Sequence, residues 1–217
     1  MRTSRLMAIA GLALFGLSSQ ASATTILDTT NGVAFNGGAG EFIQNIPGVA
    51  PLQSLAITFS LSSPGTIQSI EAYIYQVSGS SAVFIGIMNN TGSNLPSGTF
   101  ISGDALTIGP GLGPINQTSL SWSLAAGTYW LAAVATPDSS LKWQTAGGLV
   151  HDYAVGDGTG NNWNLTPGGL GDTEPMAKIL GIETATTPLP AALPLFATGI
   201  GGLGLLGWRR RRKAQAV

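Results

Sequence analysis

The sequence predicts an all-β protein, an antiparallel β-sandwich of jelly-roll type, flanked by an N-terminal signal helix and a C-terminal transmembrane helix. Three observations support this prediction. Short runs that favour β-structure recur between clusters of Gly, Pro, Asn and Ser. A sustained 3.6-residue period is found only near the two termini, and both termini carry uncharged apolar segments. The chain has 217 residues, which predicts one main domain.

Several segments in the middle of the chain have strand character, and turn-forming clusters separate them. They are residues 55–61, 70–75, 83–87, 120–124, 127–136 and 176–183. Most of them alternate apolar and polar residues, which is the pattern of a half-buried strand. The segment GTYWLAAVAT at 127–136 is apolar on both faces, as expected of a central strand. A spacing of about ten to fifteen residues favours a sandwich formed by residues 24–187.

The N-terminus has the three parts of a secretory signal peptide in the usual order. Arg2 and Arg5 form a positively charged start, residues 6–17 are apolar, and Ala21-Ser22-Ala23 supplies small residues for cleavage. The apolar run is too short to span a bilayer comfortably. We therefore expect residues 1–23 to be removed, so that Thr24 begins the mature chain.

The C-terminus carries a second apolar segment, which has the features of a membrane span. Residues 191–208 contain no charge, and as a helix they would measure about 27 Å, enough for a thin bilayer. Trp208 ends the segment, where an interfacial aromatic residue belongs. The cations that follow predict a stop-transfer anchor with its end in the cytoplasm: Arg209, Arg210, Arg211, Arg212 and Lys213.

A short proline motif, Pro188-Leu189-Pro190, precedes this span. Prolines keep a chain extended and remove backbone donors, which suits recognition by a processing enzyme. The proline motif, the Gly-rich apolar span and the Arg cluster, in this order within residues 187–213, resemble the PEP-CTERM sorting signal in a Pro-Leu-Pro variant. The resemblance divides the chain into a signal peptide (1–23), a β-domain (24–187) and a sorting signal (188–217).

This resemblance implies a route of delivery. Proteins with such a signal are exported by Gram-negative bacteria that make extracellular polysaccharide, and an exosortase, a membrane cysteine protease and transpeptidase, processes them. The resemblance implies a transient anchor in the inner membrane, then a place at the cell surface or in the extracellular polymeric substance. A permanent membrane anchor is one alternative. The Gram-positive sortase signal is another, but it needs a Leu-Pro-x-Thr-Gly motif, which Leu193-Pro194 does not begin.

The β-domain is acidic although the whole chain is nearly neutral. Between Thr24 and Thr187, two lysines (Lys142 and Lys178) oppose all ten acidic residues, which leaves a net charge of −8. Nucleic-acid binding requires a basic surface, so we expect no nucleic-acid partner. The expected partners are the processing enzyme, the inner membrane and extracellular polysaccharide.

Residues suited to catalysis or metal binding are scarce. The sequence has no cysteine and one histidine, His151, which excludes thiolate nucleophiles and His-rich zinc sites. It has no G-x-S-x-G motif, and we interpret His151-Asp152 as a polar pair at a strand or loop edge. The segment DGTGNN at 157–162 fits a calcium loop loosely, but it lacks the ligand spacing and the closing Glu, which favours a hairpin connection. We expect neither an enzyme nor a bound metal or cofactor.

Sugar binding requires exposed aromatic rings that pack against the C–H faces of a sugar. Trp163 lies between asparagines in the segment NNWN, so we expect it to be exposed and to offer such a platform. The other tryptophans of the β-domain share faces with apolar residues or lie in the central strand. We expect these three in the core: Trp122, Trp130 and Trp143.

Tyr73 and Tyr75 form a second aromatic pair, on the polar face of the segment that carries Glu71. This pair predicts either a sugar-binding patch or a partly covered outer sheet face. Together these observations predict a non-catalytic exported surface or extracellular-matrix protein. The alternative is an extracellular carbohydrate-binding module that contacts its ligand through Trp163, Tyr73 and Tyr75.

Overall fold

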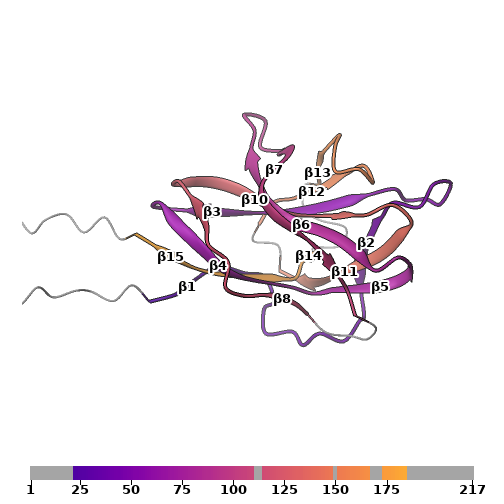
Figure 1. The fold of residues 1–217 in the computed structure, drawn as a ribbon, viewed down its shortest axis with the longest axis horizontal. Helices are drawn as coiled ribbons and strands as arrows, with labels where there is room; N and C mark the ends of the chain where they lie inside the picture. Colours follow the sequence, from indigo (N-terminus) through magenta and orange to yellow (C-terminus); the bar gives the residue numbers. More distant parts are fainter. Residues whose placement is uncertain (1–21, 110–113, 149–150, 167–172, 185–217) are drawn as a thin grey trace, which may run out of the picture.

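The structure is a computed structural model that describes residues 22–109, 114–148, 151–166 and 173–184. Over these ranges the protein is all-β, without an α-helix, and its strands pair antiparallel in sheets (Figure 1). The predicted all-β class with antiparallel strands is therefore confirmed. None of the described segments forms a helix that is able to cross a membrane. Most of the expected signal helix (residues 1–21) and the whole of the sorting signal (188–217) lie outside the described residues.

The largest sheet has six strands and contains three of the predicted ones. In spatial order its strands are β13 (Asn164–Thr166), β12 (Tyr153–Gly156), β3 (Ser54–Leu61), β10 (Gly127–Ala135), β6 (Ala82–Asn90) and β7 (Pro96–Thr107). Strand β10 lies between β3 and β6, in the middle of the sheet. This is the position that its two apolar faces predict.

Two smaller sheets complete the fold. The first contains β1 (Thr24–Asp28), β15 (Ala177–Glu183), β4 (Gly65–Ala72) and β8 (Ile115–Gln117), and β9 (Trp122–Leu124) also pairs with β4. The second contains β14 (Thr173–Pro175), β11 (Ser139–Gly147) and β2 (Gly40–Gln44), and β5 (Ile74–Gly79) pairs with β11. Because β1 pairs with β15, the two ends of the described chain lie side by side (Figure 1).

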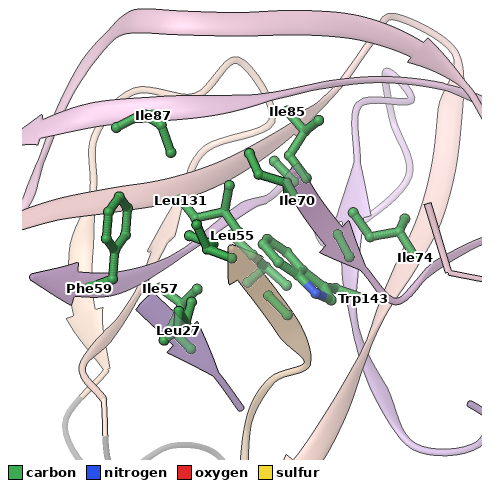
Figure 2. Close-up of a cluster of buried hydrophobic side chains, with 14 of the residues drawn as sticks. Leu27, Leu55, Ile57, Phe59, Ile70, Ile74, Ile85, Ile87, Leu131 and Trp143 are labelled. Carbon is green, nitrogen blue, oxygen red and sulfur yellow. The ribbon is translucent and has the colours of Figure 1, made fainter. Parts of the chain in front are cut away.

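The main hydrophobic core joins side chains from all three sheets (Figure 2). Strand β3 contributes Leu55, Ile57 and Phe59, and the odd-numbered positions of β10 contribute Leu131 and its neighbours. Large aliphatic side chains that are fully buried stabilise the fold by roughly 1.5–3 kcal/mol each. Trp143 of β11 lies within this core, where its Nε1 donates a hydrogen bond of 2.8 Å to the carbonyl oxygen of Met176.

The opposite face of the six-stranded sheet carries a second, smaller hydrophobic cluster. One row of residues that face one another across β12, β3, β10, β6 and β7 is small, and we call it the small-residue row: Ala154, Ala56, Ala132, Gly86 and Gly103. Aromatic rings occupy the space above part of this row. A Cβ atom added at Gly86 would lie 2.9 Å from the ring of Phe100, and one added at Gly103 would lie 2.6 Å from the ring of Phe84.

The predicted strand at 70–75 is two strands in the structure. β4 ends at Ala72 and pairs with β15, whereas β5 begins at Ile74 and pairs with β11. Tyr73 lies at the crossing, and its backbone N–H donates to the carbonyl oxygen of Met176 over 3.2 Å. Alternation continues through the break because Ala72 and Ile74 are both buried, so the pattern alone does not reveal the change of sheet.

Candidate functional site

Trp163 is buried, so the expectation of an exposed platform at this residue is wrong. Only 8% of the residue is exposed, and its Nε1 donates a hydrogen bond of 2.9 Å to the carbonyl oxygen of Gly160. The ring packs so closely against Gly156 that an added Cβ would lie 2.9 Å away. The physical reason is the small-residue row, because alanines in β3, β10 and β12 leave space that the indole fills.

The three tryptophans predicted in the core differ from one another in burial. Trp130 and Trp143 are fully buried, which confirms the prediction for both. Trp130 faces the second cluster, and its Nε1 donates to Asn90 Oδ1 over 2.8 Å. Trp122 is only half-buried and packs against the border of the main core, so its predicted burial holds only in part.

The segment 157–162 is closed by its own hydrogen bonds. Asp157 Oδ1 accepts from Thr159 Oγ1 (2.6 Å), Thr159 N (2.9 Å) and Asn161 N (3.0 Å), and Asp157 Oδ2 accepts from Asn162 Nδ2 (2.7 Å). The hydrogen bond from the Thr159 hydroxyl, with smaller contributions from the other donors, lowers the pKa of Asp157 to about 2. This network uses the oxygens that a calcium ion would need.

Tyr73 and Tyr75 form a surface cluster with Phe35, which we call the aromatic patch. The ring centroid of Phe35 lies 5.7 Å from that of Tyr73 and 6.1 Å from that of Tyr75, and all three residues are half-buried. The Tyr73 hydroxyl donates to Glu71 Oε1 over 2.7 Å, and the Tyr75 hydroxyl donates to the carbonyl oxygen of Gly38 over 3.1 Å. Both hydroxyls are therefore engaged within the protein.

The chemistry of the aromatic patch follows from these contacts. Partial burial, followed by the hydrogen bond to Glu71 and its charge, raises the pKa of Tyr73 to about 12. Burial also raises the pKa of Tyr75. In the adjoining row of side chains, Lys142 lies between Tyr75 and Phe42, and its Nζ is 4.6 Å from the centroid of the Phe42 ring. The patch offers ring faces and few open hydrogen-bonding groups.

A cleft of about 550 Å³ opens at one end of the six-stranded sheet, where β3 ends and β10 and β12 begin. Segments far apart in the sequence form it, namely β1, β3, the loop between β6 and β7, β10 and the residues before β12. Six of its lining residues are polar and two are apolar. They are Thr58, Ser60, Asn94, Thr128, His151 and Asp152, with Ile26 and Phe59.

His151 is held in the cleft by a buried acid from β14. Glu174 is 1% exposed, and its Oε2 lies 3.1 Å from His151 Nδ1 and accepts from the His151 backbone N–H over 3.1 Å. A carboxylate only accepts hydrogen bonds, so Nδ1 carries the hydrogen. In the neutral ring, Nε2 is then an acceptor. Among the described residues, none forms a hydrogen bond with this atom.

The remaining polar groups of the cleft are positioned by hydrogen bonds to one another. The carbonyl oxygen of Asp152 accepts from both the backbone N–H (2.9 Å) and the hydroxyl (3.1 Å) of Thr58, and Asn94 Nδ2 donates to Asp152 Oδ2 over 2.8 Å. The hydroxyls of Ser60 and Thr128 are 3.1 Å apart on facing strands. The cleft therefore presents a fixed array of hydroxyl, amide, carboxylate and imidazole groups.

No pattern in the sequence brings these residues together. His151-Asp152 was expected at a strand or loop edge, and the pair does lie just before β12. Glu174, its partner, follows 23 residues later in the chain. One feature of the sequence points to Glu174. It is the only acid in the segment TEPMAKIL, whose apolar residues are mostly buried.

The other predicted site residues lie at the ends of the chain. Ala23 and Thr24 are exposed, and Thr24 is the first residue of β1. Ala21, the motif Pro188-Leu189-Pro190 and the segment 208–213 lie outside the described residues. Within the described ranges, no three His, Asp or Glu side chains are grouped to hold a metal ion.

Comparison with known proteins gives no relative from which to transfer a function. No protein-family model matches the chain, and the search of curated proteins finds none that is similar to it.

Proposed function

We propose that the protein is a jelly-roll-like β-sandwich without catalytic activity that is exported and then sorted by an exosortase-type enzyme to the cell surface or the extracellular matrix of a Gram-negative bacterium. The observation that carries this proposal is the C-terminal order of Pro188-Leu189-Pro190, the uncharged span 191–208 and the cations 209–213. The signal peptide exports the chain, the span holds it transiently in the inner membrane, and cleavage near the proline motif releases or transfers it.

The arrangement of the β-domain supports this route. The first strand begins at Thr24, the residue after the proposed signal-peptide cleavage, and the last described strand ends at Glu183, shortly before Pro188. Thr24 lies opposite Gly181 in the β1–β15 pair. Both membrane segments would therefore leave the folded domain at the same end, which suits a domain attached to one membrane.

Intact-mass analysis tests the proposal in a Gram-negative host that contains an exosortase and in the same host without it. With the exosortase, we expect the form in the medium to begin at Thr24 and to lack residues 209–217. Without the exosortase, we expect the chain to remain in the membrane with residues 209–213 intact. A form in the medium that keeps the basic tail would contradict the proposal and favour a plain anchor.

Substitutions in the motif make this test specific. We expect the double variant Pro188→Ala/Pro190→Ala to remain in the membrane, because the extended segment that the enzyme reads is lost. Pro194→Ala is the matched control, since it makes the same chemical change outside the motif. Equal release of the two variants would show that the exosortase does not recognise the proline motif.

A second candidate function is carbohydrate binding outside the cell. The aromatic patch favours it, because Phe35, Tyr73 and Tyr75 present half-buried rings at the surface. Trp163 does not contribute to this candidate function because it is buried. A glycan array tests it, and the absence of binding to any glycan would remove this candidate without affecting the sorting proposal.

A further inference from the structure

We propose that the cleft lined by Ser60, Thr128, His151 and Asp152 is the binding site for a neutral saccharide. This inference rests on the candidate function of carbohydrate binding, and it locates the site in the cleft rather than in the aromatic patch. The cleft volume of about 550 Å³ lies within the range of small-molecule sites, roughly 300–1,000 Å³.

The polar groups of the cleft match a ligand rich in hydroxyl groups. Each sugar hydroxyl donates one hydrogen bond and accepts others, so a complementary site needs acceptors and donors close together. Asp152 supplies carboxylate acceptors, Asn94 supplies amide groups, and Ser60 and Thr128 supply hydroxyls on adjacent strands. Ile26 and Phe59 add apolar lining for the C–H groups of a sugar ring.

His151 adds a hydrogen-bonding group whose direction is fixed. Because Glu174 Oε2 binds Nδ1, Nε2 lies on the side of the ring away from Glu174, where it accepts a hydrogen bond in the neutral ring and donates one in the protonated ring. The buried carboxylate also holds the His151 backbone N–H, which restrains the residue as a whole. Such preorganisation lowers the entropic cost of binding a small ligand.

The charges around the cleft favour a neutral ligand over an acidic one. Asp152 contributes a negative charge, and the described residues that line the cleft include neither Lys nor Arg. The surrounding β-domain carries a net charge of −8. A uronic acid would therefore bring a carboxylate close to Asp152 with no Lys or Arg among these lining residues to balance it, which disfavours binding.

Isothermal titration calorimetry with the full chain tests this inference. The protein is kept in a zwitterionic detergent, since detergents with sugar headgroups would compete for the site. The probes are cellotetraose, maltotetraose and mannotetraose as neutral ligands, and tetragalacturonate as the acidic one. We expect at least one neutral tetrasaccharide to bind and tetragalacturonate to bind at least tenfold more weakly than that ligand.

Two sets of variants locate the site. We expect Asp152→Asn, and separately the double variant Ser60→Ala/Thr128→Val, to weaken binding at least tenfold. The first replaces a charged acceptor by an amide donor and the second removes two hydroxyls, and both nearly preserve shape. Asp138→Asn and Ser78→Ala are matched controls and should bind as the parent protein does. Asp138 lies in the turn after β10, at the opposite end of that strand from Thr128, and Ser78 lies in β5.

The outcomes separate a failure of the inference from a failure of the function. Binding that the Tyr75→Ala variant abolishes, and the cleft variants leave unchanged, would overturn the cleft as the site and retain carbohydrate binding through the aromatic patch. Tighter binding of tetragalacturonate than of every neutral tetrasaccharide would overturn the ligand class. No binding of any saccharide would overturn both the inference and the carbohydrate-binding function. Circular dichroism of each variant establishes that a loss of binding does not come from unfolding.

Discussion

Strand β12 joins two polar segments that each contain an aspartate and differ in what they offer a ligand. His151 and Asp152 precede the strand, and the segment 157–162 follows it. Asp157 accepts four hydrogen bonds from its own loop, whereas only one side-chain oxygen of Asp152 is engaged among the described residues. The carboxylate oxygens of Asp157 are thus occupied by hydrogen bonds within its own loop, whereas His151 and Asp152 line the cleft.

Residue type alone therefore does not identify a binding site. An acid whose oxygens are bound by neighbours two to five residues away stabilises its own loop. An acid positioned by a distant strand through its backbone, as Thr58 positions Asp152, keeps side-chain atoms available. A polar side chain is available to a ligand when its hydrogen-bonding atoms are not already satisfied by nearby residues of its own loop.

Removal of the Trp163 ring should have the largest effect on stability. We expect Trp163→Ala to lower the free energy of unfolding by about 3–5 kcal/mol, because the buried indole closes the second cluster over the small-residue row. Urea unfolding followed by circular dichroism measures this. Trp163→Phe is the control, and it should lose about 1–2 kcal/mol, since it keeps a ring and loses the bond to Gly160. A loss below about 1 kcal/mol for Trp163→Ala would mean that packing of the Trp163 ring does not stabilise the fold.

The contact between Glu174 and His151 should have an intermediate effect. We expect Glu174→Gln to lower the free energy of unfolding by about 1–3 kcal/mol, because an amide is a weaker acceptor for His151 Nδ1 and the site is buried. Imidazole ¹⁵N chemical shifts should show a hydrogen on Nδ1 in the parent protein and a mixture of tautomers in the variant. Glu41→Gln in β2 is the matched control. A parent ring that carries its hydrogen on Nε2 would contradict the assignment of Nε2 as an acceptor.

The smallest effect is expected at Asp157. The pKa of Asp157 in the folded protein is about 2, below its ordinary value of 3.8, so ionisation of this acid stabilises the fold. That stabilisation is fully present above about pH 4 and is lost as the pH falls toward 2. We expect Asp157→Asn to cost about 1 kcal/mol at neutral pH and to flatten the decline in stability between pH 4 and pH 2.

Asp138→Asn is the control for this prediction, because it makes the same change at an exposed turn. Unfolding by urea at a series of pH values from 2 to 7 measures both variants. If Asp157→Asn declined as steeply as the parent between pH 4 and pH 2, Asp157 would not be held by its loop in the way the hydrogen bonds indicate.

Much of the fold could be predicted because the apolar positions of its strands are the buried ones, although β3 and β10 are buried on both faces. Strands β3, β6, β10 and β15 bury the residues that the pattern selects, and Trp143 lies in the main core as expected. Strand β11 was harder to predict because it buries polar side chains on one face. Ser140 donates to Gln44 Oε1 over 2.7 Å, so a buried serine there is satisfied by a partner that is remote in sequence.

The candidate site was less accessible to prediction for a related reason. The burial of Trp163 depends on alanines and glycines in other strands, and NNWN by itself indicates exposure. The cleft depends on Thr58 and Thr128 from β3 and β10 meeting Asn94 and His151 from two loops. Contacts between such distant segments depend on strand register, which a single sequence does not specify.

The central claim is that the residues before β12 are available to a ligand and those after it are not. Amide chemical-shift mapping by NMR, with the neutral tetrasaccharide that binds most tightly, tests this most directly. We predict perturbations at Thr58, Ser60, Thr128 and Asp152 and none across residues 157–162. Perturbations confined to 157–162 or to the aromatic patch, with the cleft unchanged, would contradict the account.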